Sequence, residues 1–172
     1  RRRSMQTMQK DARFEQLVNA YSSWLYRYAY WLTSDRSAAE DLVQETFLRA
    51  WRFLDALQDE GSARSWLTTI LRRENARRYE RRRLSMAEAE LDAIPSEAVD
   101  FDPRPETLAL RHAMRQLPHK YREPLVLWVL QGFSLDDIAA VFELPRNTVA
   151  TRLHRARQKL RATLTADQKD VS

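Results

Sequence analysis

Apolar residues recur every three or four positions along most of this chain, which is the spacing of amphipathic α-helices. The strongest pattern covers residues 12–33, where an aromatic-rich stripe predicts a helix with one side in a core. The pattern breaks at residues 33–35 and resumes over 38–54. Ser37 followed by Glu40 predicts a capping box at the start of this second helix. A short loop between two such helices favours an antiparallel pair.

The helix predicted over residues 38–54 is apolar around most of its circumference, and Trp51 and Phe53 widen its buried face. What remains is a polar strip that contains one leucine. The members of this polar strip are Asp41, Gln44, Glu45, Leu48, Arg49 and Arg52. A single exposed leucine is ordinary on a solvated helix. The alternative interpretation is that the polar strip binds another protein.

A third helix is predicted after a break at residues 55–65, where Gly61 and Ser62 occur. It begins with an apolar stripe at residues 66–71 and ends as a basic rod, because residues 72–83 hold seven arginines and only two glutamates. A solvated helix end is the simpler interpretation. This charge density exceeds what solubility requires, however, and it favours contact with a polyanion. An asparagine and a tyrosine in the same stretch add groups that suit unpaired bases.

Residues 84–105 separate this basic helix from the rest of the chain. The segment is acidic, contains three prolines and has weak periodicity, so we interpret it as a linker with at most a helical turn at 86–93. Beyond it, one helix ends near Pro118, and the next is stopped by Gly132 in the position after its C-cap. Pro118 and Pro124 each suit a first helical turn, so both remain candidates for the start of that helix.

The last part of the chain carries a helix-turn-helix pattern. Ser134 with Asp137 opens a short helix, residues 143–145 form a tight turn, and a second helix follows with Val149 on its buried stripe. Its outward side chains suit the major groove, where arginine reads guanine and asparagine reads adenine. These are Arg146, Asn147, Thr148, Thr151, Arg152, Arg155 and Lys159. A helical hairpin with a basic solvated face is the alternative, but cap, turn, stripe and charge together favour DNA binding.

The composition excludes several kinds of site. The chain of 172 residues fits one ordinary domain or two small ones, and it has no cysteine and only two glycines. Disulfides, thiolate metal sites and glycine-rich phosphate loops are therefore excluded. The three histidines are widely spaced, so we expect no metal, no cofactor and no enzyme activity. No apolar run approaches the ~20 residues of a membrane helix, so we expect a soluble, cytoplasmic chain without membrane insertion.

The net charge of +5 is unevenly distributed. Residues 61–83 carry +6 and residues 146–172 carry +5, whereas residues 84–110 between them carry −6. Two basic blocks separated by an acidic one predict two polyanion-binding surfaces, and nucleic acid is the obvious polyanion. An anionic membrane is less favoured, because neither block has a strong apolar face beside it. We expect residues 1–11 to be a disordered tail or a cloning remnant, and residues 167–172 to be a tail.

Four segments together resemble the extracytoplasmic-function (ECF) group of bacterial sigma factors. They are AEDLVQETFLRAW at 39–51, WLTTI at 66–70, SLDDIA at 134–139 and TVATRLHRARQKL at 148–160. The resemblance implies an all-α transcription initiation factor with two small helical domains joined by the acidic linker. The first domain, residues 12–83, would bind core RNA polymerase and melt the minus-10 promoter element. The second, a helix-turn-helix domain over residues 106–166, would read the minus-35 element. The resemblance also implies regulation by an anti-sigma factor, which in this family is often membrane-linked.

By position, the resemblance assigns roles to groups of residues. Asp41, Gln44 and Glu45 match the family's polymerase-docking motif, and the rest of the polar strip lies beside them. The loop at residues 58–65 matches the one that captures a flipped minus-10 base, and its candidates are Gly61, Ser62 and Arg64. The basic helix matches the one that lies against the melting strand, and its candidates are Arg72, Arg73, Asn75, Arg77, Arg78, Tyr79 and Arg82. The seven outward residues of the last helix match the minus-35 reader.

Two departures from the family pattern fall on positions predicted to face DNA. Arg73 stands where family members often have asparagine, and Asn147 stands where they often have glycine. We therefore expect the promoter sequence read by this chain to differ from the commonest one. Two rival functions stay open at this point. A dimeric operator-binding regulator would explain the helix-turn-helix but not the basic helix or the polar strip. A DNA-processing enzyme such as a recombinase would need a nucleophile or a metal site.

Overall fold

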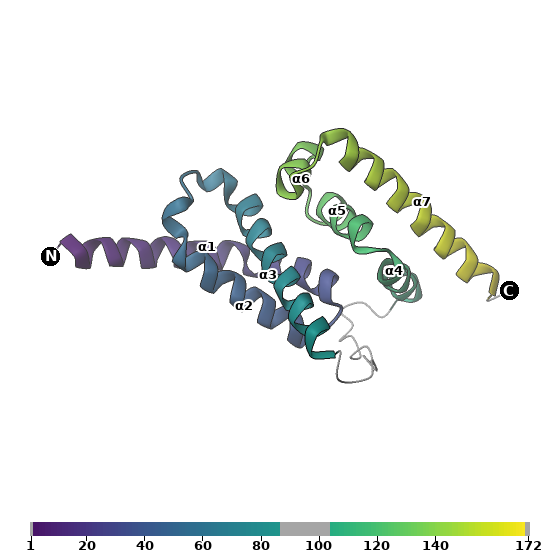
Figure 1. Cartoon of the computed structure of the whole chain (residues 1–172), viewed down its shortest axis with the longest axis horizontal. Coiled ribbons are helices and arrows are strands. Elements are labelled where there is room, and N and C mark those ends of the chain that lie inside the picture. The colour runs from purple at the N-terminus through teal and green to yellow at the C-terminus, as the bar shows by residue number, and fades with distance from the viewer. Residues whose placement is uncertain (1, 87–103, 171–172) are drawn as a thin grey trace. The chain divides into compact units, whose positions relative to one another are not determined.

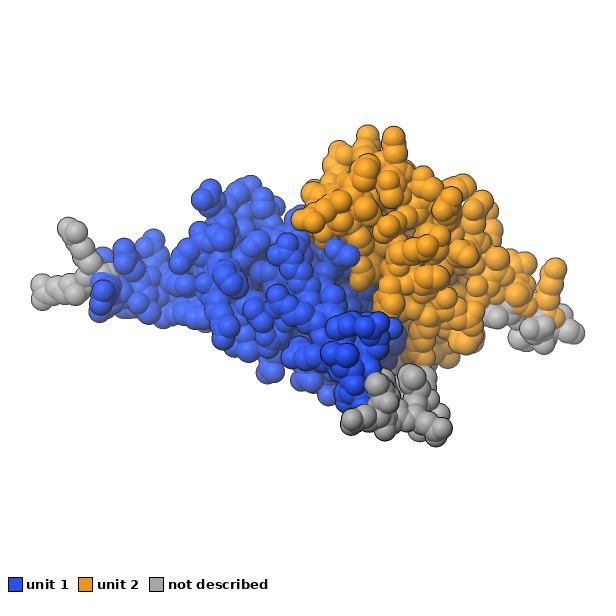
Figure 2. Space-filling view, viewed as in Figure 1, with its two compact units in different colours: residues 1–96 blue, residues 97–172 orange. Residues whose placement is uncertain are grey.

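The computed structural model describes residues 2–86 and 104–170, so most of the predicted linker, with nearly all of the turn expected at 86–93, lies outside the described residues. Within the described ranges there are helices and turns but no strand, which confirms the all-α prediction. The chain divides into two compact units, residues 1–96 and 97–172 (Figure 2). The elements are α1 (Arg2–Thr33), α2 (Arg36–Arg52), the 3-10 helices η1 (Leu54–Ala56) and η2 (Glu60–Ser62), α3 (Ala63–Met86), α4 (Pro105–Gln116), α5 (His119–Val129), α6 (Leu135–Phe142) and α7 (Arg146–Asp170).

The described residues of unit 1 form the helices α1, α2 and α3 (Figure 1) together with η1 and η2. α1 packs along α2, and α3 packs against both. The largest fully buried side chains are Leu25 and Tyr28 from α1, Leu42 from α2, and Leu67 and Leu71 from α3. Each lies on an apolar stripe of its helix, and burying one such side chain stabilises the fold by about 1.5–3 kcal/mol. This shared core holds the polar strip and the basic helix on one rigid body.

α1 begins at Arg2, so the prediction of a disordered tail over residues 1–11 is wrong for its described part. No glycine or proline interrupts the chain before the end of α1. The hydroxyl of Thr7 donates to the carbonyl of Arg3 at 2.9 Å, and Lys10 Nζ lies 3.5 Å from Asp55 Oδ2. The first turns show no apolar stripe because they are mostly solvent-exposed, and an exposed helix need not have one.

The capping box predicted at Ser37 is also wrong. Asp35 is the N-cap of α2, and its Oδ1 accepts a hydrogen bond from the backbone N–H of Ala38 at 2.7 Å. Asp35 has the extended backbone that an N-cap needs, and aspartate caps a helix as well as serine does. Glu40 instead forms an i,i+4 ion pair with Arg36 at 3.1 Å. The cap therefore lies two residues before the predicted one.

The connection between α2 and α3 consists of η1, η2 and the residues between them. Phe53 was predicted to lie in the core, but its side chain is 56% exposed. α2 ends at Arg52, and the change to a 3-10 turn brings Leu54 rather than Phe53 inward, with Leu54 only 1% exposed. Leu57 is buried as well. These two leucines fasten the connection to the core of unit 1.

Unit 2 is organised around α7, which contacts α4, α5 and α6. α5 begins at His119 with Pro118 as its N-cap, which settles the start that the two prolines left open, and Pro124 lies inside the helix. At the chain's end, α7 continues to Asp170, so the tail predicted over residues 167–172 is wrong for its described part.

A buried arginine joins α4 to α5. Arg122 is 8% exposed, and its Nε donates to the carbonyl of Met114 at 2.7 Å while Nη2 donates to that of Leu117 at 2.9 Å. Nη2 also donates to the carbonyl of Arg115. The Met114 carbonyl also accepts from the N–H of Leu117 at 3.3 Å. The last carbonyls of a helix lack the usual intrahelical donors, so the guanidinium supplies donors at the end of α4. Burial and the nearby Arg115 lower the pKa of Arg122, although Glu123 opposes them.

The predicted helix-turn-helix is present as α6, a tight turn and α7. Ser134 Oγ accepts from the N–H of Asp137 at 3.1 Å, and Asp137 Oδ2 accepts from the N–H of Ser134 at 3.1 Å, so the predicted capping box is confirmed. Glu143 adopts a left-handed backbone with φ 53°, which reverses the chain between the two helices. Ile138 and Val149 are buried between them. No helix in the described ranges is long and apolar enough to cross a membrane.

Candidate protein and nucleic-acid interfaces

The polar strip lies on the solvent side of α2, as its spacing predicts. Leu48 is 59% exposed, and Asp41, Gln44 and Arg52 are exposed beside it. Glu45 and Arg49 are half-buried at one edge. Every other apolar side chain of α2 is at least partly covered. The strip is therefore a charged surface with one large apolar group near its centre.

A buried glutamate on α3 connects the polar strip to the basic helix, and it was not singled out from the sequence. Glu74 is 3% exposed, and its Oε1 lies 2.7 Å from Arg77 Nη1 and 3.1 Å from Arg49 Nε. Arg49 Nε also lies 3.5 Å from Glu45 Oε1. The sequence does carry a signal for this burial. Glu74 stands three residues after Leu71 and seven after Leu67, so it continues the buried stripe of α3.

A second, weaker pair joins the same two helices. Arg78 Nη1 lies 3.7 Å from Asp41 Oδ2, and the Asp41 side chain is 63% exposed. A pair this exposed is worth little to stability, at most about 1 kcal/mol. Together with Glu74 it nevertheless shows that two residues predicted for DNA, Arg77 and Arg78, are held by carboxylates in this structure.

The basic helix also presents a second group of predicted residues, which lie beside Arg78 and away from Arg77. Arg72, Asn75, Tyr79 and Arg82 are spaced three, four and three residues apart, which places them on one face of α3. The Tyr79 ring is 63% exposed, and Arg82 is exposed next to it. Arg73 is exposed on the opposite flank. A face with guanidinium, amide and phenol groups can contact phosphates and stack on bases.

The loop predicted to capture a base is an ordered turn. Asp59 caps η2, because its Oδ1 accepts from the N–H of Gly61 at 3.0 Å and its Oδ2 accepts from Ser62 Oγ at 3.2 Å. Gly61 and Ser62 are exposed at its tip. Arg64 is half-buried, with its guanidinium carbon 5.2 Å from the ring centre of Trp24. The tip is therefore open to solvent, while Arg64 already stacks on an aromatic ring.

On α7, the predicted minus-35 residues border a groove with the first turn of α5. The groove has a volume of about 400 Å³, and no carboxylate is among the residues that line it. Its lining consists of Lys120, Tyr121, Asn147, Thr148, Thr151, Arg152 and Arg155. Three of these side chains are cations, which suits an anionic ligand. Arg146 lies outside the groove and pairs with Asp136 at 3.3 Å.

Tyr121 joins the two walls of this groove. Its ring is 7% exposed, with Lys120 Nζ 5.0 Å and Lys159 Nζ 5.8 Å from the ring centre. Desolvation raises the pKa of Tyr121, but hydrogen bonds and charges from Arg155 and Lys120 outweigh it, so the pKa lies below its ordinary value. The hydroxyl is thus held among cations at the edge of the groove.

Two residues on this surface were missed by the sequence argument. Lys120 lies in a different helix from the recognition residues, and only the fold brings it beside them. His154 is exposed on α7 three residues after Thr151 and next to Arg155, so the helical spacing alone could have identified it. Among the described residues, no group of three or more histidine, aspartate or glutamate side chains could hold a metal ion.

The fold and these surfaces define a class of protein: the described residues form two helical units with basic surfaces on both and a helix-turn-helix in the second. Comparison with known families narrows the class. Sigma-70 region 2 matches residues 17–84, and sigma-70 region 4 matches residues 107–160.

Similar proteins agree with these matches. The chain is 35% identical to the ECF RNA polymerase sigma factor EcfG of Rhodopseudomonas palustris, over 83% of this chain and 80% of that protein. It is 33% identical to SigL of Mycobacterium tuberculosis, over 86% of both chains. Identity to SigE of Mycolicibacterium smegmatis is 35%, and there the match spans only 60% of the relative's length. The chain therefore belongs to the ECF group of RNA polymerase sigma factors.

Solved structures show the same likeness. The sigma factor RpoE of Bartonella quintana, determined with the anti-sigma factor NepR, matches with a TM-score of 0.77 and 30% identity over 90% of this chain and 98% of that one. CnrH, determined with the cytosolic domain of CnrY, matches with a TM-score of 0.68 and 29% identity over 90% and 88%. Members of this family are transcription initiation factors that direct RNA polymerase to promoters, and this chain is one of them.

Proposed function

We propose that the polar strip on α2 is the surface that binds core RNA polymerase, with Leu48 at its centre. The observation that supports this most is the 59% exposure of Leu48 on a helix whose other apolar residues are covered. An apolar group surrounded by polar ones has the arrangement of a typical protein interface, with an apolar core and a polar rim. Asp41, Gln44 and Glu45 form that rim, with Arg49 and Arg52 at its edges.

The test is a change of Leu48→Asp in the full chain. It should weaken binding to core polymerase by at least about tenfold, the effect of removing a central contact. Met8→Asp is a matched control, because Met8 is 70% exposed on α1, outside the polar strip. Circular dichroism should show equal helix content for both variants. Unchanged core binding of Leu48→Asp would refute the proposed docking role.

We further propose that unit 1 contacts the minus-10 element through the η2 loop and α3. Gly61, Ser62 and Arg64 would hold the flipped base at the loop, and the face of Arg72, Asn75, Tyr79 and Arg82 would lie along the opened strand. Exposure of the loop tip and the aromatic and guanidinium groups on that face support this assignment. Arg73, Arg77 and Arg78 flank that surface and would contact phosphates.

Unit 2 is proposed to read the minus-35 element through α7. Its recognition surface would combine Asn147, Thr148, Thr151, Arg152 and Arg155 with Arg146 and Lys159, and the carboxylate-free groove supports it. A dimeric operator-binding regulator is the competing function that the helix-turn-helix alone would allow. Such a protein would bind duplex DNA tightly by itself, whereas this chain should require core polymerase.

We also infer that an anti-sigma factor regulates this chain, and the likeness to an RpoE solved with NepR supports it. Such a partner should compete with core polymerase for the chain, which size-exclusion chromatography of the three components would show. We infer as well that the chain acts in the cytoplasm beside the polymerase and supplies no catalytic group of its own. The polymerase would carry out all of the RNA synthesis.

A further inference from the structure

Arg13 of α1 reaches the connection between α2 and α3 and contacts it at three points. Its Nε lies 2.6 Å from Glu60 Oε1, and its Nη1 donates to the carbonyl of Leu54 at 3.3 Å. Its Nη2 donates to the carbonyl of Leu57. A planar guanidinium can serve three acceptors at once because its donors diverge in fixed directions. One side chain of α1 therefore holds both η1 and the first residue of η2.

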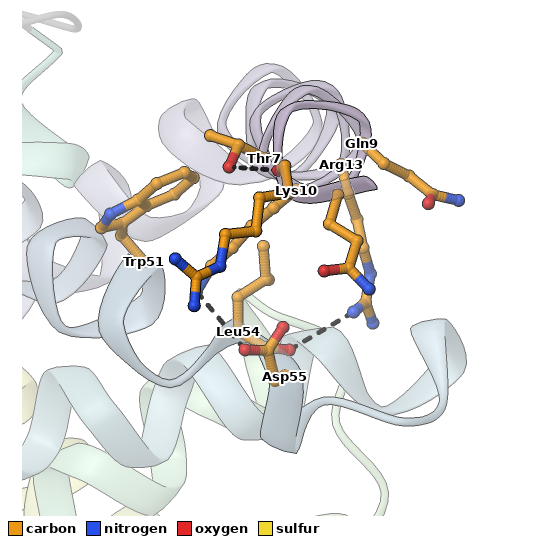
Figure 3. Close-up of a pocket in the computed structure, with 9 residues that line it drawn as sticks. Thr7, Gln9, Lys10, Arg13, Trp51, Leu54 and Asp55 are labelled. Atoms are coloured by element: carbon orange, nitrogen blue, oxygen red, sulfur yellow. Dashed lines mark hydrogen bonds and ion pairs between the residues drawn. The ribbon is translucent and has the colours of Figure 1, made fainter. Parts of the chain in front are cut away.

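Lys10, one helical turn earlier, supports the same contact. Its Nζ lies 3.5 Å from Asp55 Oδ2 and 5.0 Å from the ring centre of Trp51. Figure 3 shows Lys10 and Arg13 extending from α1 towards Asp55 and Leu54, at the side of a pocket between the helix and η1. Two side chains from the third and fourth turns of α1 thus contact the connection at Leu54, Asp55, Leu57 and Glu60.

On the side that faces α1, these contacts add to the buried Leu54 and Leu57 and to the Asp59 cap described above. η1 and η2 are single turns, and their closing backbone bonds are Leu57 N to Leu54 O at 3.1 Å and Ser62 N to Asp59 O at 3.0 Å. Short 3-10 turns have poorer hydrogen-bond geometry than α-helices and shift more easily. Glu60 immediately precedes Gly61, so the point where Arg13 holds the chain adjoins the exposed tip.

We propose that Arg13 is a positioning residue for minus-10 recognition, which acts by fixing the η2 loop in the conformation that receives the flipped base. The proposal rests on the base-capturing role given to this loop above. Arg13 is not assigned a contact with DNA, because its guanidinium is occupied by Glu60 and two carbonyls. Displacing a recognition loop by about 1 Å is enough to lose much of its selectivity.

The experiment measures binding of single-stranded non-template DNA to the holoenzyme assembled from core polymerase and the full chain. One oligonucleotide carries the preferred minus-10 bases, and a second carries a replaced base at the captured position. Arg13→Ala should reduce the ratio of the two affinities by about five- to tenfold, as expected when a base loses part of its site. Arg13→Lys should also fail to restore the ratio, because a single ammonium cannot reach all three acceptors.

Controls separate positioning from folding. Arg36→Gln removes an exposed ion pair with Glu40 at 3.1 Å in the same unit and should leave the affinity ratio unchanged. Glu60→Gln removes the ion pair from only one of the three contacts of Arg13 while keeping an acceptor oxygen there, and it should give an intermediate ratio even if Arg13→Ala proves unstable. Core binding and duplex minus-35 binding should be the same in all of these variants.

The outcomes distinguish the positioning role proposed for Arg13 from the base-capturing role proposed for the η2 loop. If Ser62→Ala and Arg64→Ala lower the affinity ratio while Arg13→Ala and Glu60→Gln leave it at the wild-type value, the positioning role of Arg13 is refuted and the role of the loop stands. If the loop variants themselves leave the ratio unchanged, the loop does not read the base, and both statements are overturned.

Discussion

Glu74 is a carboxylate buried between the polar strip and the basic helix. Burying a charge is costly unless it is paired, and here Arg77 and Arg49 lie 2.7 and 3.1 Å from Glu74 Oε1. The Arg77 side chain is 51% exposed, so solvent weakens its part of the interaction. Glu74 thus couples the position of α3 to that of α2 by charge as well as by packing.

Replacing this carboxylate should destabilise unit 1. Glu74→Gln leaves the half-buried Arg49 without its closest anionic partner, and we expect a loss of about 1–3 kcal/mol in urea denaturation. Glu80→Gln is the matched control, because Glu80 is exposed and pairs within α3 with Arg83 at 2.8 Å. The control should change stability by less than about 0.5 kcal/mol. Equal effects of the two variants would show that the Glu74 cluster contributes nothing specific.

His119 predicts a pH dependence for unit 2. Desolvation lowers the pKa of His119, although the residue keeps an exposed surface, and the charge of Arg122 lowers the pKa further, whereas Glu123 raises it. The pKa in the folded state is therefore below the unfolded value of about 6.5, and the unfolded chain binds more protons between the two values. Stability should fall as pH drops below about 6.5. Thermal denaturation from pH 7.5 to 5.5 should show a smaller decrease for His119→Gln, and identical pH profiles would contradict this account.

At the scale of single elements, the start of α2 offers a direct comparison of two candidate caps. Asp35 accepts the hydrogen bond from Ala38 N, whereas Ser37 lies inside the helix and is exposed. Asp35→Ala should destabilise unit 1 by about 1 kcal/mol, the usual contribution of an N-cap. Ser37→Ala should change stability by less than about 0.5 kcal/mol. Chemical denaturation measures both changes. A larger loss of stability for Ser37→Ala than for Asp35→Ala would mean that Ser37 caps α2, as the sequence predicts.

The groove beside α7 should make two kinds of contact with DNA, one to base edges and one to phosphates. Arg155 lies on the outward face of the recognition helix, and Arg155→Ala should cost about 1–3 kcal/mol on the preferred minus-35 sequence and less on others. Lys120 projects from α5, and Lys120→Gln should weaken binding equally for all sequences and reduce the salt slope by about one. Fluorescence anisotropy of holoenzyme on minus-35 duplexes at several salt concentrations measures both. A sequence-dependent loss for Lys120→Gln would contradict its assignment to phosphate.

Most helices could be predicted from the sequence because their buried apolar residues recur every three or four positions. The stripe of α1 from residue 12 onward, the capping box of α6 and the turn before α7 are all local patterns, and the structure confirms them. The helix over residues 2–11 could not be predicted because an exposed helix need not show an apolar stripe. Asp35 was not predicted as the N-cap of α2 because both Asp35 and Ser37 are residue types that cap helices. Local patterns predict an element well only where one side of it is buried.

The candidate surfaces could be predicted only in part. Exposure of Leu48 follows from its position on the helical wheel, whereas the pairing of Arg49 with Glu74 joins residues 25 positions apart and leaves no local trace. The same holds for Arg13 and Glu60, which are separated by 47 positions. Contacts of this kind depend on how α1, α2 and α3 pack, and that packing is set by the whole core of unit 1.

At the scale of the whole molecule, the alternation of charge along the chain matches the division into two units. The basic blocks at residues 61–83 and 146–172 fall in different units, and the acidic block at residues 84–110 spans the boundary between them. Two separate DNA-contacting surfaces can read two promoter elements, with the acidic segment disfavouring contact between the linker and DNA. The polar strip that we propose as the polymerase-binding surface belongs to unit 1, so docking would bring the DNA-facing surface of that unit directly to the enzyme.

The most direct measurement is transcription in vitro from a promoter template, with core polymerase and this chain supplied separately and together. We expect a specific transcript, and permanganate-reactive thymines at the minus-10 element, only when both are present. We also expect weak binding of duplex promoter by the chain alone. Tight duplex binding by the chain alone, with no core-dependent transcript from its bound sites, would contradict the account.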